Sequence, residues 1–194
     1  MTISYCYDTE FLDDGSTIDL ISIGIVCEDG REYYAVNSDM PRERISRDDW
    51  LCQNVVPHLP LVDGKIEQLA GNRGCVWALD MTSPLVKPKQ WIADDVREFL
   101  LPAASDHNPE LWAYFGAYDH VVLAQLWGKM ISLPAGIPMY THDLKQEMDR
   151  LGIASTAVPH NQDAHDALAD ARRNWAMLRE IRRPQITDGT GALA

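Results

Sequence analysis

The sequence predicts an α/β protein with a mixed sheet of about five strands, an antiparallel N-terminal meander and helices on both faces. Three observations support this class. Strand patterns fill the first 36 residues, helix and strand patterns alternate from residue 89 onward, and a long amphipathic helix precedes the tail. Parallel strand connections place helices on the faces of a sheet, so we expect both faces to be covered.

Three strands are predicted at the N-terminus. Residues 2–8 (TISYCYD) are rich in β-branched and aromatic side chains, which favour strands. Residues 17–27 (TIDLISIGIVC) are largely apolar, as expected for a central strand. The Asp29-Gly30 pair separates this segment from REYYAV at 31–36, and Asp-Gly between two strand patterns is a strong hairpin signal.

The rest of the chain carries helix patterns with two strands among them. Residues 110–115 (ELWAYF) and 137–142 (IPMYTH) have strand character. The prolines and glycines of 60–90 break every regular pattern, and we expect an excursion with one short helix there. We expect one domain over 1–183 and a disordered tail over 184–194. Apolar spacings of three and four residues predict helices over 46–57, 89–101, 118–130, 143–151 and 166–182.

Composition and charge disfavour several classes of protein. The chain has 194 residues, 17 of them basic and 29 acidic, for a formal net charge of −12 at pH 7. This balance disfavours a broad basic surface for duplex nucleic acid but allows a small acidic site that binds divalent cations. The N-terminus lacks the pattern of a signal peptide, and no stretch has the ~20 apolar residues of a membrane span. We expect a cytoplasmic protein without membrane contact.

The cysteines carry no metal-binding or redox motif. None of Cys6, Cys27, Cys52 and Cys75 forms a C-x-x-C pair, and no histidine stands at zinc-finger spacing from them. Disulfide frameworks are typical of short secreted chains. We therefore expect all of these cysteines to be reduced, small and buried.

Acidic residues at two strand ends indicate a site. Asp8 and Glu10 end the first strand, and residues two apart in a strand face the same side of the sheet. Neighbouring carboxylates repel each other unless a cation lies between them, so the pair suits a hard divalent metal. Asp119 follows the strand at 110–115 and falls at or near a helix start, where ligands gather in open α/β sheets. Taken alone, each feature is also typical of a solvated strand end or a helix N-terminus.

A third motif opens the last helix. His165 and Asp170 are separated by about 140° around a helix, so they cannot share a helix face. They converge only if His165 precedes the helix, and Asp166 is a suitable N-cap for that arrangement. The arginines on this helix suit either a solvated face or a contact for a nucleic-acid backbone or a partner subunit; they are Arg172, Arg173, Arg179, Arg182 and Arg183.

The order of these motifs resembles that of the DEDDh group of 3'-5' exonucleases, in the ribonuclease H-like superfamily. The matching residues are Asp8 and Glu10 in YDTEF, Asp119 in GAYDH, and His165 with Asp170 in HDALAD. Within the group, the segments DLISIGIV, LWAYFGAYDH and HDALADAR are similar to polyadenylate-specific exoribonucleases of the RNase AS type. The resemblance covers most of the chain apart from the middle segment and the tail.

This resemblance implies a ribonuclease H-like fold and a metal-dependent 3'-5' exoribonuclease. Such an enzyme releases nucleoside 5'-monophosphates from single-stranded RNA 3' ends, here with adenosine-rich ends favoured. Two Mg²⁺ or Mn²⁺ ions per site are implied, because two cations offset the negative charge of a phosphodiester transition state. The expected metal ligands are Asp8, Glu10, Asp119 and Asp170, and His165 is the expected general base.

Residues beside the first acidic pair are expected to contact substrate. They are Thr9, Phe11 and Leu12, and an aromatic side chain at this place suits stacking on a terminal base. Core packing is the alternative for Phe11 and Leu12. The implied partners are single-stranded RNA 3' ends and a second copy of the chain in a homodimer.

Two other functions fit the same residues. A DNA exonuclease or proofreading subunit would use the same site, and a non-catalytic nucleotide-binding module would keep only the fold. The intact set of acidic residues and histidine argues against the second of these. The sequence contains no G-x-S-x-G, Walker, G-x-G-x-x-G or H-E-x-x-H motif, which disfavours the chemistries that those motifs support.

Overall fold

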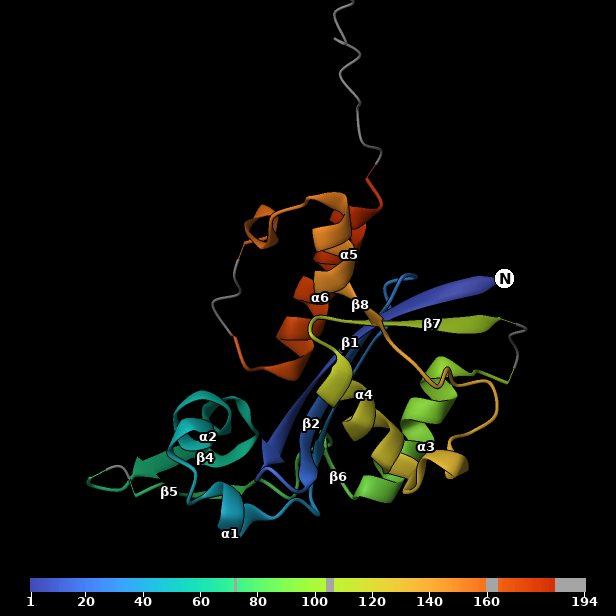
Figure 1. The fold of residues 1–194 in the computed structure, drawn as a ribbon. Coiled ribbons are helices and arrows are strands. Elements are labelled where there is room, and N and C mark those ends of the chain that lie inside the picture. The colour runs from blue at the N-terminus through green and yellow to red at the C-terminus, as the bar shows by residue number, and fades with distance from the viewer. Residues whose placement is uncertain (72, 104–106, 160–163, 184–194) are drawn as a thin grey trace, which may run out of the picture.

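A mixed six-stranded sheet forms the centre of the molecule, which confirms the predicted mixed α/β class (Figure 1). The computed structural model describes residues 1–71, 73–103, 107–159 and 164–183, and the tail predicted at 184–194 lies outside them. In sheet order the strands are β6 (Val86–Lys87), β3 (Glu32–Asn37), β2 (Ile18–Cys27), β1 (Thr2–Asp13), β7 (Asn108–Ala113) and β8 (His142–Asp143). The first three strands form the predicted antiparallel meander, and β6, β7 and β8 each run parallel to a neighbour.

Strand β1 has 12 residues and its neighbour β7 only 6, and this difference opens the sheet on one side. Pairing between the two strands runs from Thr2, opposite Asn108, to Cys6, opposite Trp112. Beyond Cys6, β1 pairs only with β2, because β7 ends at Ala113 and the chain turns away. On the side away from β2, the second half of β1 therefore has backbone groups that face no strand in the described part of the chain.

Helices cover both faces of the sheet, as predicted (Figure 1). Helices α3 (Lys89–Leu100) and α4 (Ala117–Ala124) share one core with Tyr5, on one face. Helices α5 (Leu144–Leu151) and α6 (Ala167–Ile181) pack around Cys6 on the opposite face. Successive side chains of a strand point to opposite faces, so Tyr5 and Cys6 divide between the two cores. In the described part of the chain, no helix is long and apolar enough to cross a membrane.

A separate hairpin occupies much of the segment for which one short helix was expected, so that expectation is wrong. Strands β4 (Leu61–Gln68) and β5 (Cys75–Leu79) pair antiparallel with each other and not with the main sheet. Most side chains of β4 are exposed, so the strand carries no apolar alternation that the sequence could show. The helix predicted over 46–57 is reduced to α2 (Asp49–Asn54) and a following 3₁₀ turn, and a short helix that was not predicted, α1 (Arg42–Ile45), precedes it.

A disulfide joins Cys52 of α2 to Cys75 of β5, so the expectation of four reduced cysteines is wrong. The two Cα atoms lie 5.7 Å apart although the residues are separated by 23 positions. Only the packing of α2 against the hairpin creates this proximity, and spacing along the chain does not reveal it. Cys6 and Cys27 are free and buried, as expected.

Two elements are shorter than predicted. The strand expected over 137–142 is reduced to the two residues of β8, and the segment before it contains Pro138, which cannot donate a ladder hydrogen bond. Helix α4 (Ala117–Ala124) ends six residues before the predicted helix does, and Gly128 then adopts a φ of 85° that a helix cannot contain.

Short 3₁₀ turns are formed by Val56–His58, Gln125–Trp127, Met130–Ser132 and Ser155–Ala157. The sheet also gains one strand over the predicted five, β6, from the unassigned segment.

Candidate active site

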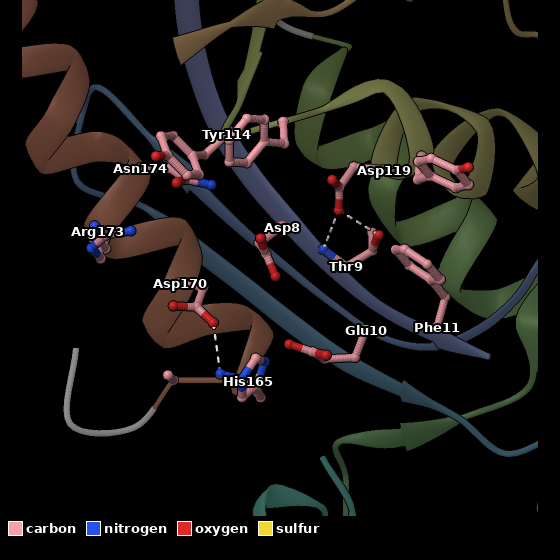
Figure 2. A pocket seen from close by; sticks show the side chains of 13 residues that line it. Asp8, Thr9, Glu10, Phe11, Tyr114, Asp119, His165, Asp170, Arg173 and Asn174 are labelled. Carbon is pink, nitrogen blue, oxygen red and sulfur yellow. Dashed lines mark hydrogen bonds between the residues drawn. The ribbon is translucent and has the colours of Figure 1, made fainter. Parts of the chain in front are cut away.

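A cavity of about 580 Å³ opens beside β1, at the point where β7 leaves it (Figure 2). Side chains from β1, from the turn into α4 and from the start of α6 surround it. All five residues of the predicted acidic and histidine set line this cavity. The lining residues are Asp8, Thr9, Glu10, Phe11, Tyr114, Phe115, Tyr118, Asp119, Ala164, His165, Asp170, Arg173 and Asn174.

Strand alternation brings the first two carboxylates together. Asp8 and Glu10 lie on the face of β1 that α6 covers, and Asp170 in the first turn of α6 points toward them (Figure 2). Glu10 is only 7% exposed. The amide of Asn174 donates a hydrogen bond of 3.0 Å to the backbone oxygen of Tyr7, which fixes α6 against β1 directly below the cavity.

Asp119 reaches the site from the opposite face, through the open side of β1. It lies in the first turn of α4, and its Oδ1 accepts two hydrogen bonds from Thr9. The backbone N–H of Thr9 donates at 2.9 Å and its hydroxyl at 2.6 Å (Figure 2). The Asp119 carboxylate thus accepts the backbone hydrogen bond that a neighbouring strand would otherwise accept from Thr9. Both bonds from Thr9 hold Asp119 in position.

His165 precedes α6, as the spacing predicted. Asp166 is the N-cap, and its side chain accepts a hydrogen bond from the backbone N–H of Ala169. The backbone N–H of His165 donates to Oδ2 of Asp170 at 2.8 Å, with His165 in a left-handed conformation at φ 72°. One ligand atom each from His165, Glu10 and Asp170 lies within 4.8 Å of the others, so the three side chains converge.

A glycine on β2 allows α6 to approach this closely. Gly24 pairs with Asp8 across β1 and β2. A Cβ at Gly24 would lie 2.3 Å from the backbone oxygen of Ala167 and 2.4 Å from the Cα of Leu168. Because only glycine fits under this turn, Gly24 sets the height of the α6 N-terminus above the sheet.

Burial raises the pKa of all four carboxylates in the cavity, and repulsion within the set raises the pKa values of Asp8 and Glu10 further. The pKa of Glu10 is raised to about 8, first by burial and then by the negative charges of Asp170 and Asp119. Burial, followed by the charge of Asp119, holds the pKa of Asp8 well above its usual range. Burial also raises the pKa of Asp119 and that of Asp170. A cation among these oxygen atoms would offset both effects, and an all-carboxylate set suits a hard divalent ion.

Aromatic residues form one wall of the cavity. The rings of Phe11 and Tyr118 stack with their centroids 6.1 Å apart and an angle of 11° between planes. Phe115, which follows β7 with a φ of 55°, is 61% exposed, and its ring meets that of Tyr114 edge-on. The site residues predicted from the sequence do not include Tyr114, Phe115 or Tyr118, although the run WAYFGAYDH around Asp119 contains all three.

Leu12 does not line the cavity. Side chains alternate along a strand, so that of Leu12 points to the same face of β1 as Glu10. Leu12 lies two residues further along, where α1, α2 and the hairpin cover the sheet. Leu12 is 5% exposed and packs with Ile21 and Val36 in that core. Its position corresponds to the core-packing alternative and not to a substrate contact.

The arginines of α6 have different surroundings. Arg172 pairs with Glu32 of β3 through two hydrogen bonds of 2.8 and 2.6 Å. Arg182 donates to the Ser4 hydroxyl at the far end of β1. Arg173 lines the cavity, with its guanidinium 5.6 Å from the ring centre of Tyr114. Arg173 is therefore the arginine placed to meet a ligand in this cavity.

The fold and this cavity define a candidate hydrolase, and comparison with known proteins assigns its family. Residues 4–182 match the family described as the 3'-5' exoribonuclease Rv2179c-like domain. The chain is 42% identical over 187 residues to the 3'-5' exoribonuclease Rv2179c of Mycobacterium tuberculosis strain H37Rv, with 96% of each chain covered. It is equally similar to the 3'-5' exoribonuclease MT2234.1 of strain CDC 1551. The chain belongs to the Rv2179c-like exoribonuclease family.

Proposed function

We propose that the protein is a divalent-metal-dependent 3'-5' exoribonuclease of the DEDDh group with a ribonuclease H-like fold. It removes nucleoside 5'-monophosphates from the 3' ends of single-stranded RNA. One observation carries the proposal: the carboxylates of Asp8, Glu10, Asp119 and Asp170 line one cavity together with His165, in a chain of this family.

The carboxylates provide the metal site in this proposal. Asp8, Glu10, Asp119 and Asp170 would hold two Mg²⁺ or Mn²⁺ ions, with Asp8 between the others. When bound, such ions stabilise the attacking and leaving oxygen atoms of phosphodiester hydrolysis. The chain supports this assignment by burying mutually repelling carboxylates whose pKa values are all raised.

His165 acts as the general base. Its imidazole takes the proton of the attacking water, because a neutral imidazole nitrogen accepts a proton and this ring converges with Glu10 and Asp170. The hydrogen bond from its backbone N–H to Asp170 fixes the turn that carries it. Removal of a general base lowers the rate by roughly 10²–10⁴-fold.

The aromatic wall receives the terminal nucleotide. A nucleobase stacks against Phe11, and Arg173 offers a positive charge to a phosphate beyond it. A net charge of −12 gives the protein little attraction for duplex phosphates, which favours single-stranded ends. A ribose 2'-hydroxyl is the group by which such a site can distinguish RNA from DNA. The preference for adenosine-rich ends and the homodimer rest on the family resemblance.

The test is digestion of end-labelled RNA homopolymers, matched DNA and a blunt duplex, with and without Mg²⁺. We expect Asp8→Asn to remove nearly all turnover without unfolding the protein, since it deletes a ligand and not a core side chain. His165→Ala should fold and bind metal but hydrolyse slowly. Glu67→Gln, on the exposed hairpin, is the matched carboxylate control and should behave as wild type.

The outcomes separate the alternatives. Wild-type turnover in Asp8→Asn would overturn the proposed site. Faster cleavage of DNA than of RNA would instead assign a DNA exonuclease or proofreading activity. Absence of metal-dependent hydrolysis on every substrate would leave a nucleotide-binding module, and equal rates on all RNA homopolymers would remove only the adenosine preference.

A further inference from the structure

Trp50 contacts the ring of His165, although the two residues belong to different parts of the fold. Trp50 lies on α2, and the ring centroids are 4.8 Å apart with an angle of 77° between planes. This separation and edge-to-face orientation are those of a favourable aromatic pair. Trp50 is 52% exposed, so half of a large apolar side chain remains in solvent beside the cavity.

Helix α2 is tied firmly to the hairpin on both sides of Trp50. The preceding residue, Asp49, accepts a hydrogen bond of 2.7 Å from the backbone N–H of Gly74. Two residues after Trp50, Cys52 forms the disulfide with Cys75. The backbone that carries the indole is therefore held between two cross-links to β5 and the turn before it.

The backbone of His165 has a different support. Its N–H is bonded to Asp170, and its positive φ marks a turn before α6 begins. This hydrogen bond fixes the main chain at His165, but it leaves the side-chain torsions free to rotate. The Trp50 contact is with the imidazole ring itself, and a nitrogen of that ring lies close to Glu10 and Asp170.

We propose that Trp50 is a positioning residue for His165. The inference rests on the proposed function, in which His165 is the general base. The indole restricts rotation of the imidazole, so that a ring nitrogen stays beside the carboxylates where the reacting water must lie. Loss of the indole leaves the site intact but spreads His165 over several rotamers, which lowers kcat and leaves KM almost unchanged.

The experiment compares Trp50→Ala, Trp50→Phe and Trp91→Ala on one single-stranded RNA. We expect Trp50→Ala to lower kcat about 10- to 100-fold, as misplacement of a catalytic group does, with KM within about threefold of wild type. Trp50→Phe keeps a ring against the imidazole and should recover most of the loss. Trp91 is 64% exposed on α3, on the other face of the sheet, and its replacement should change neither constant.

A second readout reports the contact itself. The indole ring current shifts the ring protons of His165 in the NMR spectrum, and His165→Ala identifies those signals by their disappearance. We expect the shift to be lost in Trp50→Ala and retained in part in Trp50→Phe. Matching circular dichroism spectra and melting temperatures verify that each variant is folded, and Trp50→Leu replaces Trp50→Ala if the latter is not.

The outcomes distinguish this inference from the proposed function. Wild-type turnover in His165→Ala would remove His165 as the base, and the role of Trp50 would be overturned with it. Slow turnover in His165→Ala with an unchanged kcat in Trp50→Ala would overturn the role of Trp50 alone. A rise in KM without a fall in kcat would also overturn it, because that pattern assigns Trp50 to substrate stacking. An unchanged His165 spectrum in Trp50→Ala would do the same.

Discussion

Replacing Gly24 by alanine tests whether the height of α6 above the sheet controls the site. The added Cβ would lie 2.3 Å from the Ala167 oxygen, whereas ordinary contacts begin at 3.4 Å. The nearest atoms are backbone, so the first turn of α6 has to move by about 1 Å. That turn carries Asp170. A displacement of this size lowers catalytic rates by roughly 10²-fold, and overpacking destabilises a protein by about 1–3 kcal/mol.

The assay measures kcat on single-stranded RNA together with the free energy of unfolding. Ala93→Val is the matched control, because Ala93 is fully buried on α3, under the opposite face of the sheet. We expect both variants to lose stability and only Gly24→Ala to lose turnover per folded molecule. Wild-type kcat in Gly24→Ala would refute the reasoning, and so would an equal loss of kcat in Ala93→Val.

Three further predictions concern the carboxylates and the disulfide. The pKa of Glu10 is raised from about 4.5, the ordinary value for glutamate, to about 8. The metal-free protein should therefore lose stability as the pH rises from 4.5 to 8. Glu10→Gln should therefore raise the metal-free Tm at pH 8 by about 8–16 °C, for roughly 4 kcal/mol, and leave it unchanged at pH 4; equal shifts at both pH values would contradict this. Thr9→Val removes one donor to Asp119 and should increase the Mg²⁺ concentration for half-maximal activity about 10-fold or more, which a metal titration measures. Removing the bond between Cys52 and Cys75, which are 23 positions apart, should lower the free energy of unfolding by about 3 kcal/mol in urea titrations.

Local patterns in the sequence predicted much of the candidate site. Strand alternation placed Asp8 and Glu10 on one face, and the structure directs both into one cavity. The N-cap signal of Asp166 placed His165 before α6, and that cap is present. These predictions succeed because the direction of a side chain within a strand, or at a helix start, depends on residues a few positions away.

Other features came only from contacts between distant segments. The hairpin of β4 and β5 is exposed on most positions, so it has no apolar period, and its disulfide partner lies on another element. The ring of Trp50 meets that of His165 across more than a hundred positions of sequence. Leu12 follows the acidic motif directly, and yet the elements packed above it exclude it from the cavity.

The sequence by itself determined the class of fold, the acidic and histidine set, and the start of the helix that carries Asp170. Only the tertiary structure decided which elements meet around that set: the open side of β1, the close approach of α6 over Gly24, and the aromatic wall beside Asp119. The physical reason is the range of the forces involved. Periodicity and capping act within one element, whereas close packing joins surfaces that are remote along the chain.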